Sequence, residues 1–145
     1  MKSFSAETSN ALIQKSLVLR YLREEAEMDY YEDVSSSLLK NAKKRLNNFK
    51  IKIIKVPGVF EIPVTISKNI KKYDGFIALG CVIKGETPHF DFISISSTQA
   101  IMNLSVDYKK PIGNGIITCL NQKQAKARGK KGKEAALAVV SVLSQ

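Results

Sequence analysis

Four short apolar runs, rich in β-branched residues, alternate with stretches of helical periodicity along this chain. The runs are short enough to be strands and lie at 17–19, 51–56, 76–83 and 115–118. Helices are expected between and after them, at 34–46, 62–70, 93–108, 123–128 and 133–144. Because parallel strands joined by helices need crossover connections, the alternation predicts an α/β fold. We expect a three-layer α/β/α sandwich around a central four-stranded parallel sheet.

The run at 76–83 is apolar throughout, which is typical of a strand in the middle of a parallel sheet with helices on both faces. In such sheets, ligands bind beyond the carboxyl ends of the strands. Residues that carry chemistry are therefore expected just after Val56, Ile83 and Thr118.

With 145 residues, the chain is long enough for one compact domain but not for two of ordinary size. We expect a single domain over 1–145, in which residues 1–16 could form a flexible N-terminal arm. The N-terminus lacks a secretory hydrophobic region, and no stretch reaches the roughly 18–20 apolar residues of a membrane span. A cytoplasmic protein without a membrane partner is expected.

The formal net charge of +10 allows three interpretations. A basic face could bind nucleic acid, attract an anionic small molecule, or remain a solvated surface. The lysines are scattered along the sequence instead of gathered on one predicted helix, and no DNA- or RNA-binding motif accompanies them. We therefore expect no nucleic-acid partner, whereas the anionic ligand and the solvated surface both stay open.

Both cysteines, Cys81 and Cys119, lie at or beside an apolar run, and neither has a further ligand at a metal-binding spacing. They are expected to be reduced, buried and to pack as small hydrophobic residues. No metal site is expected.

His89 is the only histidine of the chain, and a single histidine can be structural or catalytic. Its expected place in a loop after a central strand, near Gly85 and Thr87, favours proton transfer near neutral pH. No serine or cysteine nucleophile motif accompanies it, so a hydrolytic triad is not supported. The turn at 84–87 could bind an anion through its backbone amides, or it could be a plain strand-to-helix turn.

Two segments carry a resemblance to a known family. They are Val-Pro-Gly-Val-Phe-Glu-Ile-Pro at 56–63 and Gly-Cys-Val-Ile-Lys-Gly-Glu-Thr-Pro-His-Phe-Asp at 80–91, and they begin 24 residues apart. Together they resemble the two signature stretches of the lumazine synthases. Further matches lie at 111–118, 124–128 and 131–136, and the resemblance covers roughly 30–140.

The resemblance implies a flavodoxin-like fold and the condensation of a ribityl-substituted diaminopyrimidinedione with a keto-phosphate, without any cofactor. It also implies a homo-oligomer, a pentamer or a multiple of it, with the site between subunits. His89 would be the general acid/base, Arg128 would hold the substrate phosphate, and Asn114 would reach the ring of a neighbouring subunit's site. The remaining substrate-binding residues would be Val59, Phe60, Glu61, Ile62, Cys81, Val82, Ile83, Gly85, Glu86 and Thr87.

Three features leave alternatives open. The family has an aromatic residue that stacks on the pyrimidine ring; we prefer Tyr30 by its spacing from Leu38, although Tyr21 follows the apolar run 17–19. The last helix is apolar nearly all round, so it could pack on another subunit, which we favour, or within its own monomer. A non-catalytic protein of the same fold that binds a flavin or lumazine is the alternative to an enzyme.

Overall fold

The computed structural model describes residues 16–21, 28–84 and 88–145. Its strands are β1 (Ser16–Tyr21), β2 (Ile51–Val56), β3 (Gly75–Ile83) and β4 (Ile112–Cys119), and they form one sheet in the order β2-β1-β3-β4. All three pairings are parallel, with Ile83 opposite Cys119 and Tyr21 opposite Val56. The carboxyl ends of the strands therefore lie along one edge of the sheet.

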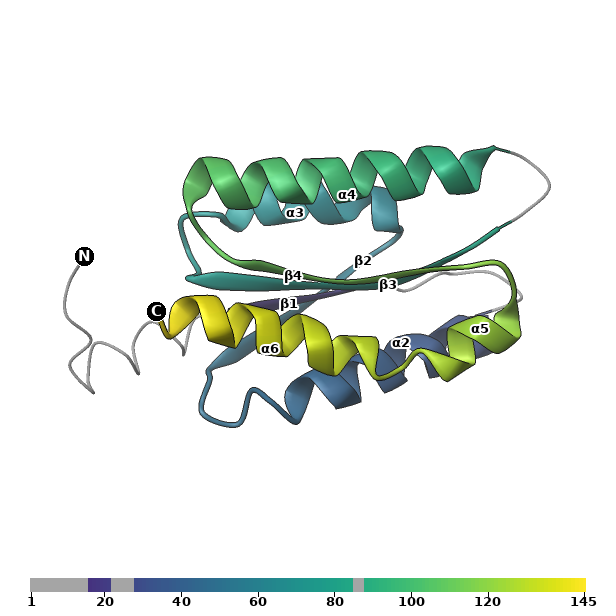
Figure 1. Ribbon diagram of the computed structural model, residues 1–145, viewed down its shortest axis with the longest axis horizontal. Coiled ribbons are helices and arrows are strands. Elements are labelled where there is room, and N and C mark those ends of the chain that lie inside the picture. The colour runs from purple at the N-terminus through teal and green to yellow at the C-terminus, as the bar shows by residue number, and fades with distance from the viewer. Residues whose placement is uncertain (1–15, 22–27, 85–87) are drawn as a thin grey trace.

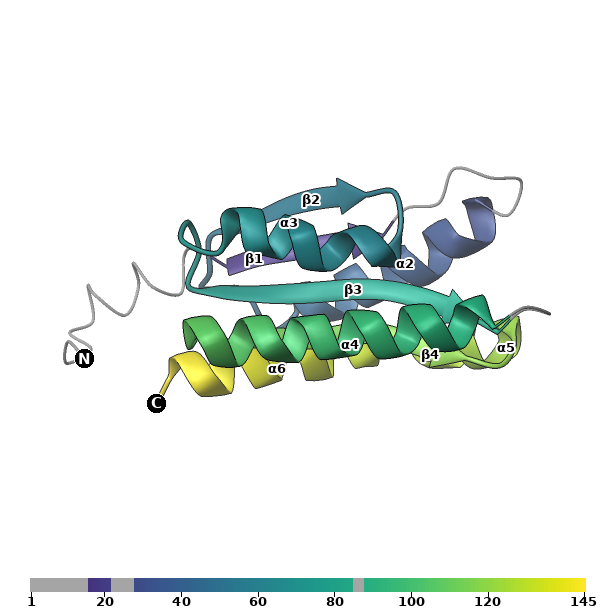
Figure 2. The same cartoon turned by 90° about the horizontal axis from the view of Figure 1, so that it is seen from above.

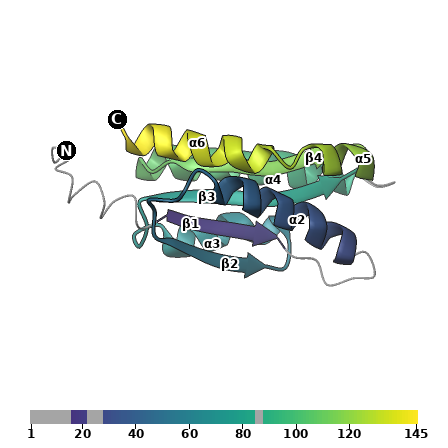
Figure 3. The ribbon, with the colours of Figure 1, turned by 90° about the horizontal axis from the view of Figure 1, so that it is seen from below.

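Helices cover both faces of this sheet (Figures 1 and 2). One face carries α2 (Met28–Lys43), α5 (Gln122–Ala127) and α6 (Lys131–Leu143), which Figure 3 shows from below. The other face carries α3 (Ile62–Asn69) and α4 (His89–Tyr108), preceded by a single 3₁₀ turn, η1 (Val59–Glu61). The expected α/β class, with a parallel sheet between helices, is confirmed.

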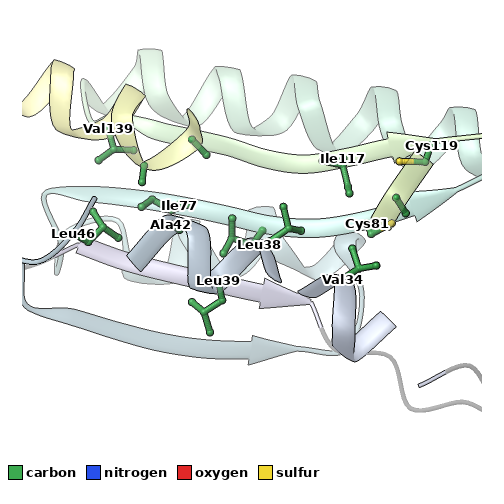
Figure 4. Packing of buried hydrophobic residues seen from close by; sticks show 14 residues of the cluster. Val34, Leu38, Leu39, Ala42, Leu46, Ile77, Cys81, Ile117, Cys119 and Val139 are labelled. Atoms are coloured by element: carbon green, nitrogen blue, oxygen red, sulfur yellow. The ribbon is translucent and has the colours of Figure 1, made fainter. Parts of the chain in front are cut away.

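Two apolar cores hold the layers together, one on each face of the sheet. The core under α2 and α6 joins residues such as Leu38, Ile77 and Val139, each with no exposed surface (Figure 4). The core under α3 and α4 joins Ile62, Phe76 and other residues. Every residue from Gly75 to Cys81 is buried, as predicted for a central strand.

Close backbone contacts between layers depend on glycine at two positions on or near α6. A Cβ at Gly132 would lie 2.0 Å from the Leu38 carbonyl oxygen on α2. A Cβ at Gly113 on β4 would lie 2.2 Å from the Ala135 carbonyl oxygen on α6. Because these neighbours are backbone atoms, a side chain could be accommodated only if the layers moved apart.

Two of the boundary differences from the sequence predictions concern elements that carry site residues. β4 begins at Ile112 instead of residue 115, and α4 begins at His89 instead of residue 93. His89 is therefore the first residue of a helix, not a loop residue, and Pro88 is the N-cap of that helix. Of the expected arm 1–16, only Ser16 lies within the described residues.

The last helix packs within its own monomer more than the sequence suggested. Four residues of α6 are buried against α2 and the sheet, namely Gly132, Ala135, Ala136 and Val139. Leu137 and Val142 of α6 are exposed, but the most exposed apolar side chains lie elsewhere, mostly on α4 and around η1. None of the helices in the described part of the chain is both long and apolar enough to cross a membrane.

Candidate functional site

The segment after β2 forms a tight turn that exposes one aromatic side chain. Val59 and Ile62 point into the core, where they are 4% and 0% exposed, whereas Phe60 between them is 63% exposed. The turn is closed by a hydrogen bond from the Glu61 amide to the Gly58 carbonyl oxygen, at 3.2 Å. Pro63, in the first turn of α3, has no amide hydrogen to satisfy there. The two buried anchors therefore present Phe60 and Glu61 at the surface.

Phe60 and Glu61 line a cavity of about 420 Å³ between α3 and α4, which falls in the range of small-molecule sites. Pro63 and Val64 of α3 and Ser96, Ser97 and Ala100 of α4 complete its lining. Its wall is mostly apolar, and Glu61 is the one ionisable residue among these. The η1 turn also contacts α4 and β3 directly. The structure thus brings the Phe60 segment and the helix that begins with His89 together on one side of the molecule.

His89 occupies the first turn of α4, just beyond the carboxyl end of β3. Helix N-termini have amide hydrogens without intrahelical partners, so they favour negative charge nearby. The structure describes the backbone of His89, whereas Gly85, Glu86 and Thr87 lie outside the described residues. Of the site residues on β3, Cys81 is buried and Val82 is half-buried, while Ile83 is described by its backbone alone.

Arg128 lies at the same edge of the sheet, beyond the end of β4. Its guanidinium Nη1 donates a hydrogen bond to the Thr118 carbonyl oxygen at 2.9 Å, and the side chain is exposed. The next carbonyl, that of Cys119, accepts from the Lys84 amide at 2.8 Å. The residue after β3 and the Arg128 side chain are therefore hydrogen-bonded to adjacent carbonyl groups at the end of β4.

A capping interaction, which the sequence analysis missed, fixes the short helix that leads to Arg128. The Asn121 side chain accepts a hydrogen bond from the Gln124 amide at 2.9 Å, and the Gln124 side chain accepts from the Leu120 amide at 2.8 Å. Asparagine followed three residues later by glutamine is a sequence signature of a helix start. The sequence alone therefore contained the signal for this helix start.

Both cysteines are free and buried close to this edge, as predicted. Burial raises the pKa of Cys81 to about 12, and the neighbouring Cys119 adds to the shift. Burial also raises the pKa of Cys119, although the charge of Arg128, whose Nη1 lies 4.0 Å from its sulfur, opposes this effect. Thiols with raised pKa values are poor nucleophiles at neutral pH. Neither is suited to nucleophilic catalysis.

Within one chain, Asn114 lies away from the carboxyl edge of the sheet. It is opposite Ala78, five residues before the end of β4, which corresponds to about 16 Å along a strand. The side chain is exposed, and its Oδ1 accepts a hydrogen bond from the Ile116 amide at 3.0 Å. A role for Asn114 in catalysis would therefore require the site of another subunit.

The two candidate tyrosines occupy different kinds of structure. Tyr21 is the last residue of β1, at the carboxyl edge and opposite Val56. Tyr30 belongs to the first turn of α2 and does not follow a strand directly. Within the described part of the chain, no three His, Cys, Asp or Glu side chains group so that they could hold a metal ion.

Comparison with known proteins decides the family. The family model described as 6,7-dimethyl-8-ribityllumazine synthase matches residues 26–145. The chain belongs to this family. A 6,7-dimethyl-8-ribityllumazine synthase of Bartonella bacilliformis is 44% identical over 114 residues, covering 74% of this chain and 75% of that protein. One of Rhodopseudomonas palustris is 40% identical over 131 residues, covering 81% and 80%.

The match to the lumazine synthase family covers every element from α2 to α6. The matched range begins at residue 26, so β1 precedes it, although β1 pairs with both β2 and β3. The family resemblance inferred from the two signature segments is confirmed.

Proposed function

We propose that this protein is a transferase of riboflavin biosynthesis. It condenses 5-amino-6-(D-ribitylamino)uracil with 3,4-dihydroxy-2-butanone 4-phosphate and yields 6,7-dimethyl-8-ribityllumazine, phosphate and water. The observation that carries the proposal is the family match over 26–145, together with relatives named 6,7-dimethyl-8-ribityllumazine synthase at 40–44% identity.

The reaction needs proton transfers and a place for a leaving phosphate, but no metal or organic cofactor. The 5-amino group of the pyrimidine attacks the ketone, and loss of water gives an imine. Phosphate then leaves, and ring closure with loss of a second water completes the lumazine. We assign the proton transfers to His89, a role in which a positioned acid or base contributes about 10²–10⁴-fold.

We assign the phosphate to Arg128 together with the backbone amides of the turn Gly85, Glu86 and Thr87. The assignment is supported by the anchoring of the Arg128 guanidinium on Thr118, which leaves its other donors for a ligand. We assign the ribityl chain and the ring edge to the segment Val59–Ile62, whose exposed Phe60 borders the 420 Å³ cavity. Cys81, Val82 and Ile83 would form the floor beneath the ring.

For the aromatic partner of the pyrimidine ring we now favour Tyr21 over Tyr30. The ring should stack on a residue at the carboxyl edge of the sheet, and Tyr21 ends β1 there, beside the segment that begins at Val56. The preference for Tyr30 rests on its spacing from Leu38 alone. In the structure, residues 28–30 belong to α2.

We further propose a flavodoxin-like fold and a homo-oligomer, a pentamer or a multiple of it. The strand order β2-β1-β3-β4 supports the fold. The exposed side chains of Phe92, Ile95, Met102 and Val106, each at least 60% exposed, support the oligomer. They recur at helical spacing along α4, and such a stripe on a globular protein is typical of a protein–protein contact.

In such an oligomer, Asn114 of one subunit would contact the ring bound by its neighbour. The two free, buried thiols favour a reducing compartment, and we place the protein in the cytoplasm with small-molecule substrates as partners. Neither a nucleic acid nor a membrane takes part in the proposed reaction.

Incubation of the protein with both substrates tests the proposal. Lumazine absorbance and fluorescence should rise faster than in the protein-free mixture. Tight retention of a flavin or lumazine without any acceleration would instead identify a binding protein of the same fold. The particle mass in solution should be that of five copies or a multiple of five.

A further inference from the structure

We propose that Asn121 and Gln124 are positioning residues for Arg128: by capping α5 they hold its guanidinium in the orientation that binds the substrate phosphate. The inference rests on the proposed function, and it adds two residues that act on the substrate only through Arg128. Both lie just beyond the end of β4, at the carboxyl edge of the sheet (Figures 1 and 2).

Arg128 is hydrogen-bonded to both ends of the segment that contains α5. Its amide donates to the Ala125 carbonyl oxygen at 3.2 Å, so the arginine closes the last turn of the helix as its C-cap. Its Nη1 donates to the carbonyl oxygen of Thr118, ten residues earlier, at 2.9 Å. The side chain thus reaches back across the whole helix, and the geometry of α5 decides where the guanidinium lies.

On its C-terminal side, the backbone of Arg128 is held without the help of α5. The Arg128 carbonyl oxygen accepts a hydrogen bond from the Lys131 amide at 3.0 Å. The next residue, Gly129, is buried beside Ser37 of α2. Loss of α5 would therefore leave the arginine at this edge of the sheet but would free the direction of its side chain. We expect a weaker effect on phosphate binding than that of removing the guanidinium itself.

α5 is too short to be stable without support. It has six residues, whereas isolated helices shorter than about 12–15 residues are marginal in water. Among the α5 side chains that the structure describes, that of Ala125 alone is buried, and those of Lys123 and Ala127 are exposed. Packing therefore anchors the helix weakly, and its stability depends on its caps.

Two side-chain hydrogen bonds supply the cap at the start of α5. Asn121 Oδ1 accepts from the Gln124 amide at 2.9 Å, and Gln124 Oε1 accepts from the Leu120 amide at 2.8 Å. The Gln124 amide is one of those that the start of a helix leaves without an intrahelical partner. Replacement of an asparagine N-cap by alanine typically shifts a helix equilibrium about fivefold, whereas serine caps almost equally well.

The expected effect on binding follows from the fraction of molecules in which α5 is formed. A ligand that needs the formed helix binds with an apparent affinity reduced by that fraction. A fivefold shift of the helix equilibrium should therefore raise the KM for the keto-phosphate about two- to fivefold. The pyrimidine does not contact Arg128 in the proposed site, so its KM should change less than about 1.5-fold.

The experiment compares the full-length variants Asn121→Ala and Asn121→Ser, with Asn69→Ala as the matched control. The Asn69 side chain donates a hydrogen bond of 2.8 Å to the Thr65 carbonyl oxygen at the end of α3, which leads to the amino edge of the sheet. We expect Asn121→Ala alone to raise the KM for the keto-phosphate, because the serine variant retains the cap and the control leaves α5 intact. The kcat of Asn121→Ala should change less than its KM for the keto-phosphate.

The variant Arg128→Ala tests whether the cap acts through the arginine. Adding Asn121→Ala to Arg128→Ala should not raise the KM for the keto-phosphate further, because the guanidinium that the cap positions is already gone. Independent effects of the two substitutions would show that the cap stabilises the fold without positioning Arg128.

Equal KM values of Asn121→Ala and Asn121→Ser for the keto-phosphate, or an equal rise in Asn69→Ala, would overturn the inference. Failure of the proposed function has a different signature, because the wild-type protein would then not accelerate lumazine formation at all. In that case the affinity for inorganic phosphate, measured by calorimetry, decides. Weaker binding by Asn121→Ala than by Asn121→Ser supports the positioning role, and equal affinities, absence of binding included, contradict it.

Discussion

At Gly132 the backbone of α6 lies directly against that of α2, and replacement of this glycine by alanine should loosen both helices. The new Cβ would lie 2.0 Å from the Leu38 carbonyl oxygen and 2.8 Å from the Leu38 carbonyl carbon. Ordinary contact begins at 3.4 Å, so the two backbones must separate by 3.4 − 2.0 = 1.4 Å at this point. No side-chain rotation can relieve the clash, because both atoms belong to the main chain.

The cost can be estimated from what such a shift disturbs. The neighbours Ala135, Ala136 and Val139 are at most 4% exposed, and they pack against the same core as Leu38. Forcing extra volume into a packed core costs about 1–3 kcal/mol, and alanine's better helix propensity recovers less than about 1 kcal/mol. We therefore expect a loss of about 2 kcal/mol, or a fall in Tm of roughly 4–8 °C.

Urea denaturation of wild type and variant at one fixed protein concentration measures this loss, since assembly also contributes to apparent stability. Gly129→Ala is the matched control. Its Cβ would meet the Ser37 hydroxyl at 2.2 Å, but that group can rotate away, so we expect a loss below about 1 kcal/mol. Equal losses for the two variants, or a loss below about 0.5 kcal/mol for Gly132→Ala, would refute the packing argument.

Four further predictions concern the site. His89→Ala should lower kcat about 10²-fold or more and leave pyrimidine affinity nearly intact in a binding titration; a loss of affinity with unchanged kcat would argue against proton transfer. Arg128→Ala should raise the KM for the keto-phosphate at least tenfold more than that for the pyrimidine. Since the pKa of Cys81 is about 12, iodoacetamide at pH 8 should alkylate it only after unfolding, as judged by mass spectrometry. Tyr21→Ala should weaken pyrimidine binding more than Tyr30→Ala, and the reverse order would identify Tyr30 as the stacking residue.

The alternation of apolar runs and helical stretches predicted much of the fold, because each run has the length and composition of a buried strand. It could not locate the start of α4. The apolar periodicity used for that helix begins at Ile93, whereas the structure starts it at His89, after Pro88. Proline before the helix and Asp91 in its first turn are the sequence signals that indicate the earlier start.

The exposed stripe on α4 was equally hard to foresee. Ile101, which is buried, and Ile95, which is 66% exposed, are indistinguishable by residue type. Periodicity reveals that a helix is apolar on several sides but not which side its own monomer covers. For the same reason the apolar composition of α6 suggested a subunit contact, although Ala135 and Val139 face the core.

The sequence predicts some residues of the candidate site but leaves its aromatic residue open. Phe60, His89 and Arg128 were predicted because two signature segments and one shorter motif carry them, and the structure has each of them after the end of a strand. For the aromatic residue, the spacing from Leu38 favours Tyr30, whereas Tyr21 follows the apolar run 17–19. Whether so short a run forms a strand depends on its long-range pairing with β2 and β3, which local sequence does not encode.

The most direct test of the whole account is the stoichiometry of the reaction. Purified protein is mixed with both substrates, and lumazine and inorganic phosphate are quantified over many turnovers, with the rate in protein-free buffer subtracted. The account predicts that the two products accumulate in a one-to-one ratio at a rate proportional to protein concentration. Lumazine formation no faster than in buffer, or phosphate release without lumazine, would contradict it.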